Sequence, residues 1–264
     1  MKSNKVFIIA EAGVNHNGSI ELAKKLIDVA AISGADAVKF QTFKAVNVVS
    51  KNAPKAEYQN KTTSPSESQF DMIKKLELDT NTHKELITYC KEKNIMFLST
   101  PFDHDSINLL NELGLKIFKI PSGEITNLPY LRHIGSLNKN VILSTGMSTI
   151  KEIDRAVDIL GSDNLVILHC TSTYPTSPSE LNLRAIPMLQ ARYGVPVGYS
   201  GHETGLASTV VAVALGACVI ERHITLDRAM WGSDQAASVE PSGLKRLVRD
   251  IRTIEQALGD GEKC

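Results

Sequence analysis

The sequence is poor in aromatic residues and has no excess charge of either sign. Phe, Trp and Tyr make up 5% of its 264 residues, and Trp231 is the single tryptophan. A groove of stacked rings for single-stranded nucleic acid or polysaccharide is therefore not supported. Lys and Arg total 29, as do Asp and Glu, so the chain lacks the positive field that attracts a polyanion. We expect no nucleic-acid partner.

Paired cysteines and long apolar runs are also missing. The four cysteines have no paired spacing, which favours reduced thiols in the cytoplasm over a disulfide framework. No run reaches the roughly 18 apolar residues of a membrane helix, and residues 1–5 lack the features of a secretory signal. We expect a cytoplasmic protein with no membrane partner. The hydrophobic content of 42% is enough for a folded core.

What the sequence does have is a regular alternation of short apolar runs and longer amphipathic ones. The runs expected as strands are residues 6–10, 37–41, 96–100, 117–120, 141–144, 165–169, 197–199 and 219–222. The patterns expected as helices cover residues 19–33, 81–93, 103–113, 128–136, 149–160, 183–193, 204–215 and 242–258. Eight such units without hairpin signals predict parallel strands closed as a (β/α)8 TIM barrel. Residues 1–264 would then form one α/β domain.

Local start and stop signals agree with this interpretation. Ser19 and Thr149 precede helical patterns, and Glu152 follows Thr149 at the spacing of a capping box. Glycines are expected to end five helices, namely Gly34, Gly114, Gly161, Gly194 and Gly216. The alternative is an open doubly wound sheet, but residues 13–18 do not form G-x-G-x-x-G and the chain has no P-loop motif.

One irregular stretch, residues 42–65, is about four times as long as a usual connection. It contains four lysines, Lys44, Lys51, Lys55 and Lys61. Long loops of this kind often act as lids over a functional site. A solvated insertion is the alternative, and the sequence leaves both open.

Two histidines suggest a metal site. The active site of a barrel lies at the carboxyl ends of its strands. His202 and His223 are 21 residues apart, which is one βα unit, so they are expected at neighbouring strand ends and can converge on one cation. A single histidine in such a place is more often a hydrogen-bonded core residue, but a pair at matched depth favours a metal. His169, one strand earlier, either faces the interior or supports a ligand from behind.

Two lysines suggest an anion site. Lys39 and Lys119 belong to the second and fourth expected strands, where a charge costs several kcal/mol unless it is opposed. A salt bridge to Glu11 or Glu124 would satisfy each lysine. Hydroxyl groups at the same strand ends favour a bound phosphate instead, and they belong to Thr100, Ser122, Ser144 and Ser200. A Schiff base between a lysine and a carbonyl substrate is the alternative.

Nine short strings lie at or near the strand ends, in order along the chain. They are EAGVNHNG (11–18), KFQT (39–42), STPF (99–102), KIPSGE (119–124), STGM (144–147), HCT (169–171), GYSGH (198–202), ERH (221–223) and GSD (232–234). Together they resemble the sialic acid (N-acetylneuraminate) synthase family. The resemblance implies condensation of phosphoenolpyruvate with an N-acylated hexosamine, N-acetylmannosamine being expected first. The products would be a nine-carbon 2-keto acid and phosphate. It also implies a divalent metal, with manganese expected and magnesium or cobalt as alternatives.

The resemblance also implies a role for each matching residue. His202 and His223 resemble the metal ligands. Glu11, Gln41 and Asp234 resemble the groups that bind the sugar, and Glu11, Glu124 and Asp234 are the expected catalytic carboxylates. The residues that resemble the phosphoenolpyruvate pocket are Lys39, Thr100, Lys119, Ser122, Ser144, Tyr174 and Ser200.

The chain departs from the family pattern in two ways. Ser172 stands where many members have Asn, so one contact on the phosphate side is expected to be changed or lost. The chain also ends at Cys264, without the antifreeze-like domain that supplies an arginine to the N-acyl pocket of a partner subunit. N-acetylmannosamine, its 6-phosphate and a 2,4-diacetamido trideoxyhexose remain candidates, and a homodimer is compatible with the barrel. Two other functions stay open, a Schiff-base keto-acid aldolase or lyase using Lys119 or Lys39 and a non-catalytic binding subunit.

Overall fold

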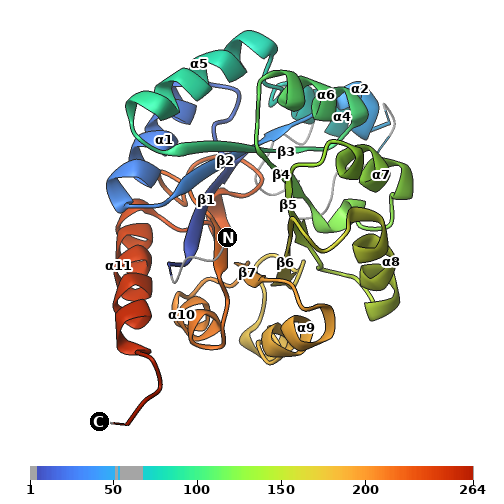
Figure 1. Cartoon of the computed structure of the whole chain (residues 1–264). Coiled ribbons are helices and arrows are strands. Elements are labelled where there is room, and N and C mark those ends of the chain that lie inside the picture. Colours follow the sequence, from blue (N-terminus) through green and yellow to red (C-terminus); the bar gives the residue numbers. More distant parts are fainter. Residues whose placement is uncertain (1–4, 51–52, 54–67, 264) are drawn as a thin grey trace.

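Eight parallel strands form one nearly closed barrel. The computed structural model describes residues 5–50, 53 and 68–263. The strands are β1 (Phe7–Gly13), β2 (Ala37–Thr42), β3 (Met96–Pro101), β4 (Ile117–Ile120), β5 (Asn140–Ser144), β6 (Leu165–Cys170), β7 (Val197–Gly201) and β8 (Val219–His223). Their hydrogen-bonded order is β3-β2-β1-β8-β7-β6-β5-β4, and β3 and β4 lie side by side where the ring meets (Figure 1). The predicted TIM barrel is confirmed.

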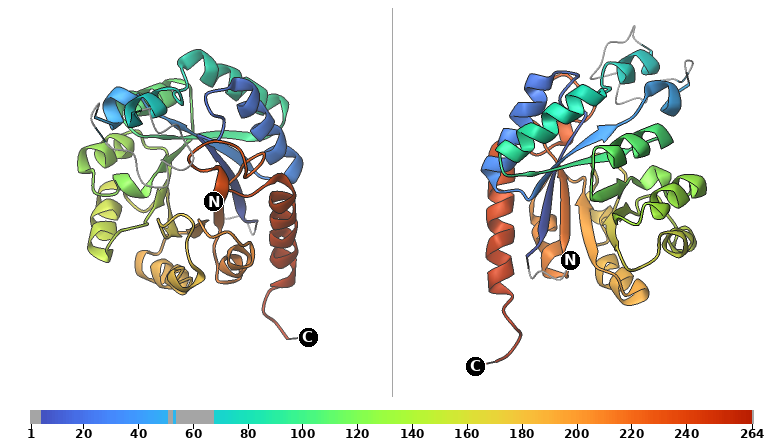
Figure 2. Two further views of the ribbon diagram at one scale, coloured as in Figure 1. Left: turned by 180° about the vertical axis from the view of Figure 1, so that it is seen from behind. Right: turned by 45° about the horizontal axis from the view of Figure 1, so that its top comes forward.

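The helices form a layer around the strands (Figure 1). They are α1 (Ile20–Ser33), α2 (Ala45–Val48), α4 (Gln69–Lys74), α5 (Thr80–Glu92), α6 (His104–Glu112), α7 (Leu128–Ser136), α8 (Ile150–Leu160), α9 (Ala185–Tyr193), α10 (Ala207–Ala214) and α11 (Pro241–Ala257). Three short 3-10 turns are η1 (Ser122–Glu124), η2 (Pro178–Glu180) and η3 (Gln235–Ala237). Figure 2 shows the helices outside the strands from two further directions. Among the described residues, none of the helices could span a bilayer.

The core has two parts because successive residues of a strand face opposite ways. Ile8 and Ala10 of β1 pack outwards under the helices, whereas Ile9 joins a small apolar cluster inside the barrel with Leu98 and Ile142. Two residues further along the same inward faces lie the buried polar side chains of Glu11, Thr100 and Ser144. The sequence alternation therefore directs the polar residues to the barrel centre.

Several predicted helix ends are confirmed. Ser19 accepts a hydrogen bond from the N–H of Leu22 at the start of α1, and Thr149 and Glu152 form the expected capping box of α8. The five glycines predicted to follow helices all have positive φ, a conformation that favours glycine. Each of these signals involves only residues within about four positions of the helix end, which explains why the sequence predicts the helix ends well.

The stretch after β2 differs from the expected irregular loop. Its first part contains the one-turn helix α2, and the six-residue α4 follows it at Gln69–Lys74. Helices this short carry too little periodicity to be recognised. Lys51, Lys55 and Lys61 lie outside the described residues, so the lid interpretation stays a prediction.

Candidate active site

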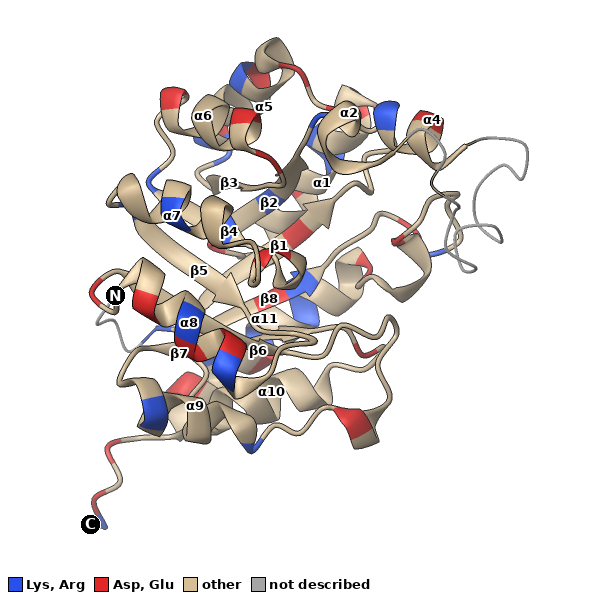
Figure 3. Cartoon of the chain, turned by 90° about the vertical axis from the view of Figure 1, so that its right-hand side faces the viewer, with Lys and Arg blue, Asp and Glu red and all other residues tan. Residues whose placement is uncertain are grey.

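Two lysines and two glutamates meet inside the barrel, all of them nearly inaccessible to solvent. Lys39 Nζ lies 2.7 Å from Glu11 Oε2 and 3.7 Å from Glu221 Oε2. Lys119 Nζ lies 3.3 Å from Glu221 Oε1. Glu221 therefore links the two lysines. The four charged side chains come from four different strands, β1, β2, β4 and β8. Figure 3 shows charged segments on the inner strands.

The ionisation of these groups leaves the cluster short of negative charge. Burial opposes ionisation of Glu221, but Lys119 and Lys39 outweigh it and lower its pKa to about 2. Burial raises the pKa of Glu11 to about 7, although Lys39 opposes this. Burial also lowers the pKa of Lys119, whereas Glu11 and Glu221 outweigh burial at Lys39 and raise its pKa. Two lysines thus face one firmly ionised carboxylate, an arrangement suited to an anionic ligand.

A cavity of about 230 Å³ opens above the cluster. Hydroxyl groups line it beside the two lysines, and Lys39 Nζ donates a hydrogen bond to Thr100 Oγ1 at 2.8 Å. Ser122 Oγ accepts a hydrogen bond from the N–H of Gly146 at 2.9 Å. The predicted site residues that line this cavity are Glu11, Lys39, Gln41, Thr100, Lys119, Ser122, Ser144, Ser200, His202 and His223. Predicted residues from seven separate stretches of sequence are therefore brought to one place.

The two predicted metal-ligand histidines face each other at this cavity. Their ring centroids are 5.6 Å apart. His202 Nδ1 is 2.7 Å from the carbonyl oxygen of Thr171 and is its hydrogen-bond donor when it carries the proton, which leaves Nε2 as an acceptor. Burial lowers the pKa of both imidazoles, and His202 adds to the effect at His223. Both rings are therefore neutral at physiological pH, the form that binds metals.

Tyr174 lies on the histidines rather than in the lining of the anion cavity. Its ring centroid is 5.3 Å from that of His202 and 5.2 Å from that of His223. Its hydroxyl group contacts Ser238 Oγ and the carbonyl oxygen of Asp234, each at 3.3 Å. Tyr174 does not line the cavity of about 230 Å³, and its expected contact with phosphoenolpyruvate stays a prediction.

The two other predicted carboxylates are placed differently from each other. Asp234 Oδ2 lies 4.0 Å from His223 Nδ1, and burial raises the pKa of Asp234. Glu124 belongs to η1 and accepts a hydrogen bond from Asn127 Nδ2 at 2.7 Å. It does not line the described cavity, because the 3-10 turn after β4 points it towards the start of α7. Its catalytic role stays a prediction that this geometry does not support.

Two further residues are clarified by the structure. The sequence showed Glu221 at the end of the eighth strand, but only the fold reveals that it lies between Lys39 and Lys119. His169 is turned away from the histidine pair, and its Nε2 lies 2.7 Å from the carbonyl oxygen of Leu181. It lines a neighbouring groove and not the anion cavity.

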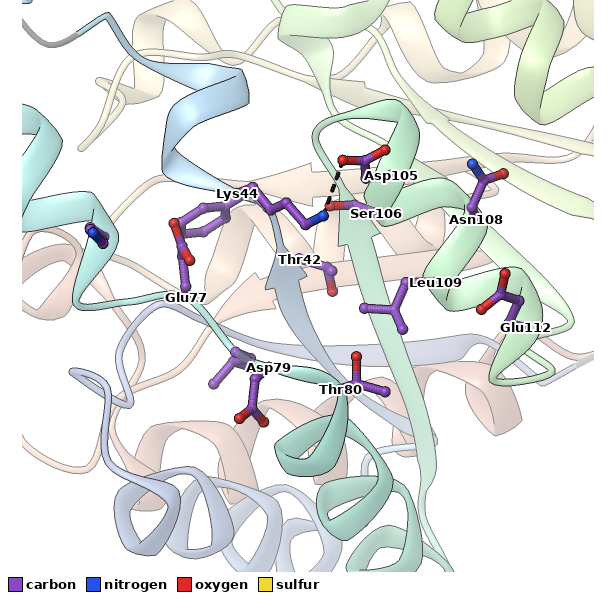
Figure 4. Close-up of a pocket in the computed structure, with 13 residues that line it drawn as sticks. Thr42, Lys44, Glu77, Asp79, Thr80, Asp105, Ser106, Asn108, Leu109 and Glu112 are labelled. Atoms are coloured by element: carbon purple, nitrogen blue, oxygen red, sulfur yellow. Dashed lines mark hydrogen bonds and ion pairs between the residues drawn. The ribbon is translucent and has the colours of Figure 1, made fainter.

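A larger cavity of about 640 Å³ lies between α5 and α6, outside the barrel. Figure 4 shows Lys44, Glu77, Asp79, Asp105 and Glu112 among its lining residues. Lys44 Nζ pairs with Asp105 Oδ2 at 3.1 Å, and more than half of each side chain is exposed. Exposed pairs of this kind are screened by water, so this cavity lacks the desolvated charges found inside the barrel.

The fold and the site define a TIM barrel with a buried cluster of two lysines and two glutamates beside a pair of neutral histidines, at the carboxyl ends of its strands. The model of the NeuB family matches residues 26–263. N,N'-diacetyllegionaminic acid synthase of Campylobacter jejuni is 58% identical over 264 residues, covering 98% of this chain and 79% of the relative. The enzyme of the same name from Legionella pneumophila is 49% identical, covering 97% of this chain and 74% of the relative.

A solved structure agrees with these relatives. The N-acetylneuraminic acid synthetase from Leptospira borgpetersenii, crystallised with citrate, superposes with a TM-score of 0.88 at 36% identity, covering 98% of this chain and 87% of that chain. The chain belongs to the NeuB family. It is a synthase of the sialic acid type, an enzyme that forms a carbon–carbon bond.

Proposed function

We propose that the chain condenses phosphoenolpyruvate with an open-chain N-acylated amino sugar, giving a sialic-type nine-carbon 2-keto acid and inorganic phosphate. The observation that carries this proposal is the buried pair Lys39 and Lys119 sharing the ionised Glu221. An anion with phosphate and carboxylate groups would supply the missing negative charge. Thr100, Ser122, Ser144 and Ser200 line the same cavity and can donate hydrogen bonds to its oxygens.

The histidine pair fits a divalent cation, for which manganese is the first candidate and magnesium and cobalt are alternatives. His223 Nδ1 is buried without a hydrogen-bond partner, as expected for a nitrogen reserved for a ligand. The hydrogen bond at His202 Nδ1 orients that ring from behind. No cluster of three or more His, Cys, Asp or Glu side chains suited to a metal occurs in the described part of the chain. Two imidazoles would therefore leave coordination positions for substrate and water.

The proposed reaction follows from these two neighbouring sites. A cation bound by the imidazoles would act as a Lewis acid on the sugar aldehyde. Lys39 and Lys119 hold phosphoenolpyruvate so that its C3 attacks the aldehyde carbon and forms the new carbon–carbon bond. The aldehyde oxygen gains a proton, water adds to C2, and the C2–O bond to phosphate breaks. Glu11, with a pKa of about 7, and Asp234 are the proposed carriers of these protons.

The Schiff-base alternative makes different demands on the lysines. A nucleophilic lysine must be unprotonated, but the pKa of Lys39 is raised by its carboxylate partners. Only Lys119, with a lowered pKa, suits that chemistry. Borohydride with pyruvate would trap a Schiff base on Lys119 and leave a phosphoenolpyruvate-dependent synthase unmodified.

Phosphate release tests the proposed function directly. The protein is incubated with phosphoenolpyruvate, manganese and either N-acetylmannosamine, its 6-phosphate or a 2,4-diacetamido trideoxyhexose. We expect phosphate and keto acid in equal amounts with at least one acceptor, and no release after chelation by EDTA. Release that survives chelation would contradict the metal step, and silence with every acceptor would favour the non-catalytic binding subunit.

A further inference from the structure

The hydroxyl group of Ser238 joins three loops beside the histidine pair. Ser238 directly follows η3, in the segment between β8 and α11, and is 3% exposed. Its Oγ accepts a hydrogen bond at 3.0 Å from Nδ2 of Asn15, which lies in the segment after β1. It also lies 3.3 Å from the hydroxyl group of Tyr174, in the segment after β6. One oxygen atom therefore connects segments that are far apart in the sequence.

The direction of each hydrogen bond in this network follows from the partners. Ser238 Oγ donates its proton to the carbonyl oxygen of Asp234 at 2.6 Å, so its lone pairs remain to accept. The amide nitrogen of Asn15 can only donate. The Tyr174 hydroxyl group is then the donor in its contact with Ser238, and it shares its proton with the carbonyl oxygen of Asp234 at 3.3 Å. The buried hydroxyl group of Ser238 is thus used both as a donor and as an acceptor.

The ring of Tyr174 extends this network to both histidines. Its centroid lies 5.3 Å from that of His202, with the two ring planes at 83°, and 5.2 Å from that of His223, with the planes at 59°. Both separations are typical of favourable aromatic contacts. Because one ring packs against both imidazoles, the anchor on its hydroxyl group limits the rotation of the two imidazoles together.

The same network also holds the backbone around His223. Asn15 Nδ2 donates a second hydrogen bond, at 2.8 Å, to the carbonyl oxygen of Ile224, the residue after His223. The backbone of Asp234 is held by Ser238, and its carboxylate oxygen Oδ2 lies 4.0 Å from His223 Nδ1. Ser238 therefore supports His223 by two routes, one through an aromatic ring and one through the segment after β8.

We propose that Ser238 is a positioning residue for the histidine pair, acting through Tyr174 and the backbone of Asp234. The inference rests on the proposed function, in which His202 and His223 bind a divalent cation. Groups that orient metal ligands from behind contribute 10–100-fold to metal affinity. Loss of the Ser238 hydroxyl group releases the anchor of the Tyr174 ring, and both imidazoles then lose part of the orientation that a cation requires.

The test measures manganese binding to the full chain and to Ser238→Ala, which removes one oxygen atom. Titration calorimetry without substrate should show an affinity about tenfold lower in the variant. The affinity for phosphoenolpyruvate without metal should stay the same, because Lys39 and Lys119 hold that anion in the proposed function. Ser106→Ala, at the start of α6, is the matched control. Ser106 is 2% exposed and its Oγ donates to Asp103 Oδ2 at 2.9 Å, so its loss should lower the melting temperature and leave manganese affinity unchanged.

Tyr174→Phe is the second variant, and it replaces Ser238→Ala if that protein unfolds. It keeps the ring against the imidazoles and removes only the hydroxyl group, so it should also weaken manganese binding. Because the two hydroxyl groups act through one contact, the loss of affinity in the double variant should be smaller than the product of the two single losses. A loss equal to that product would contradict an action of Ser238 through Tyr174.

The imidazole resonances of the metal-free protein give a readout that needs neither metal nor turnover. With nitrogen-15-labelled histidine, the ring signals of His202 and His223, assigned from the His202→Ala and His223→Ala spectra, should shift in Ser238→Ala and stay in place in Ser106→Ala. Unshifted ring signals, or unchanged manganese affinity in the folded variant, would overturn the inference while phosphate release upheld the proposed function. Absence of manganese binding to the unchanged chain would reject the cation of the proposed function, and the ring signals would still decide the inference.

Discussion

At the scale of single residues, the site depends on an imbalance of buried charge. Lys39 is paired with Glu11, and Glu221 lies between Lys39 and Lys119. Burial alone would neutralise such groups, so each charge persists only because an opposite one lies within about 4 Å. Glu11, whose pKa is near 7, is the one carboxylate of the cluster that can change its proton within the physiological range.

Glu221→Gln is expected to destabilise the fold. It leaves Lys119 buried without a carboxylate partner, and breaking a buried pair in this way costs about 3–5 kcal/mol. Urea denaturation measures the loss. Added phosphoenolpyruvate or phosphate should recover part of it by supplying an anion to the two lysines, whereas Glu112→Gln on the exposed face of α6 should change little. A Glu221→Gln protein as stable as the unchanged chain would contradict the charge argument.

The histidine pair gives a prediction that is independent of turnover. His202→Ala and His223→Ala should each weaken manganese binding by at least about 100-fold, because even the partners behind metal ligands contribute 10–100-fold. Titration calorimetry or the resonance of free manganese measures the affinity. His133→Ala, on the outer helix α7, is the control. Unchanged manganese affinity in either variant would contradict a cation site at these two histidines.

The sequence predicts the features of the site that follow from strand spacing and burial, but not the contacts that depend on the folded barrel. The histidine pair follows from one βα spacing, and the lysines follow from their place in buried strands. The contact of Glu221 with both lysines could not be predicted, since it depends on which side chains face each other across the barrel. The packing of Tyr174 against both histidines could not be predicted either, because it brings together residues that are far apart in the sequence.

At the scale of elements, local chemistry determines where most helices begin and end. The strands were predictable because parallel strands are buried on both faces and read as apolar runs. The short α2 and α4 were missed, since a single turn shows no period. These missed elements line a cavity of about 300 Å³ next to the site, so the barrel framework was more predictable than the segments around its mouth.

The capping box of α8 provides a test at this scale. Thr149→Ala removes the oxygen that accepts the N–H of Glu152 and should lower the free energy of unfolding by about 1 kcal/mol. Turnover should be unaffected, because α8 lies in the outer layer. Thr253→Ala within α11 is the matched control. That hydroxyl only bonds back to the carbonyl oxygen of Arg249, so its loss should be neutral or slightly stabilising. Equal losses in the two variants would show that the cap contributes nothing specific.

At the scale of the whole molecule, the first strand and the last helix are joined at the end of the barrel opposite the site. Asp36, just before β2, accepts hydrogen bonds from Lys5 Nζ at 2.7 Å, from the N–H of Ile8 at 2.9 Å and from Arg252 Nη2 at 2.7 Å. Arg252 of α11 also donates to the carbonyl oxygen of Val6. One carboxylate thus connects β1 and the start of β2 to α11, which lies about 200 residues further along the chain.

Asp36→Asn is therefore expected to destabilise the molecule as a unit at neutral pH. Hydrogen bonds to a charged group contribute about 1.5–3 kcal/mol, and the lower half of that range applies here because the Asp36 side chain keeps some exposure to water. Urea denaturation should show a lower midpoint with an unchanged slope. Asp163→Asn, in the exposed loop before β6, is the control and should leave the midpoint in place.

The pH dependence of the unfolding free energy separates the electrostatic contribution of Asp36 from the packing contribution of its side chain. Burial would raise its pKa, but Lys5, the N–H of Ile8 and Arg252 outweigh burial and lower it below the usual 3.8. A carboxyl group whose pKa is lower in the folded state stabilises the fold above its unfolded pKa, and this stabilisation disappears as the pH falls through the folded value. The difference in unfolding free energy between the unchanged chain and Asp36→Asn should therefore be largest near pH 6–7 and shrink below about pH 4. A difference that stays constant down to pH 3 would show that the contribution is one of packing and not of charge.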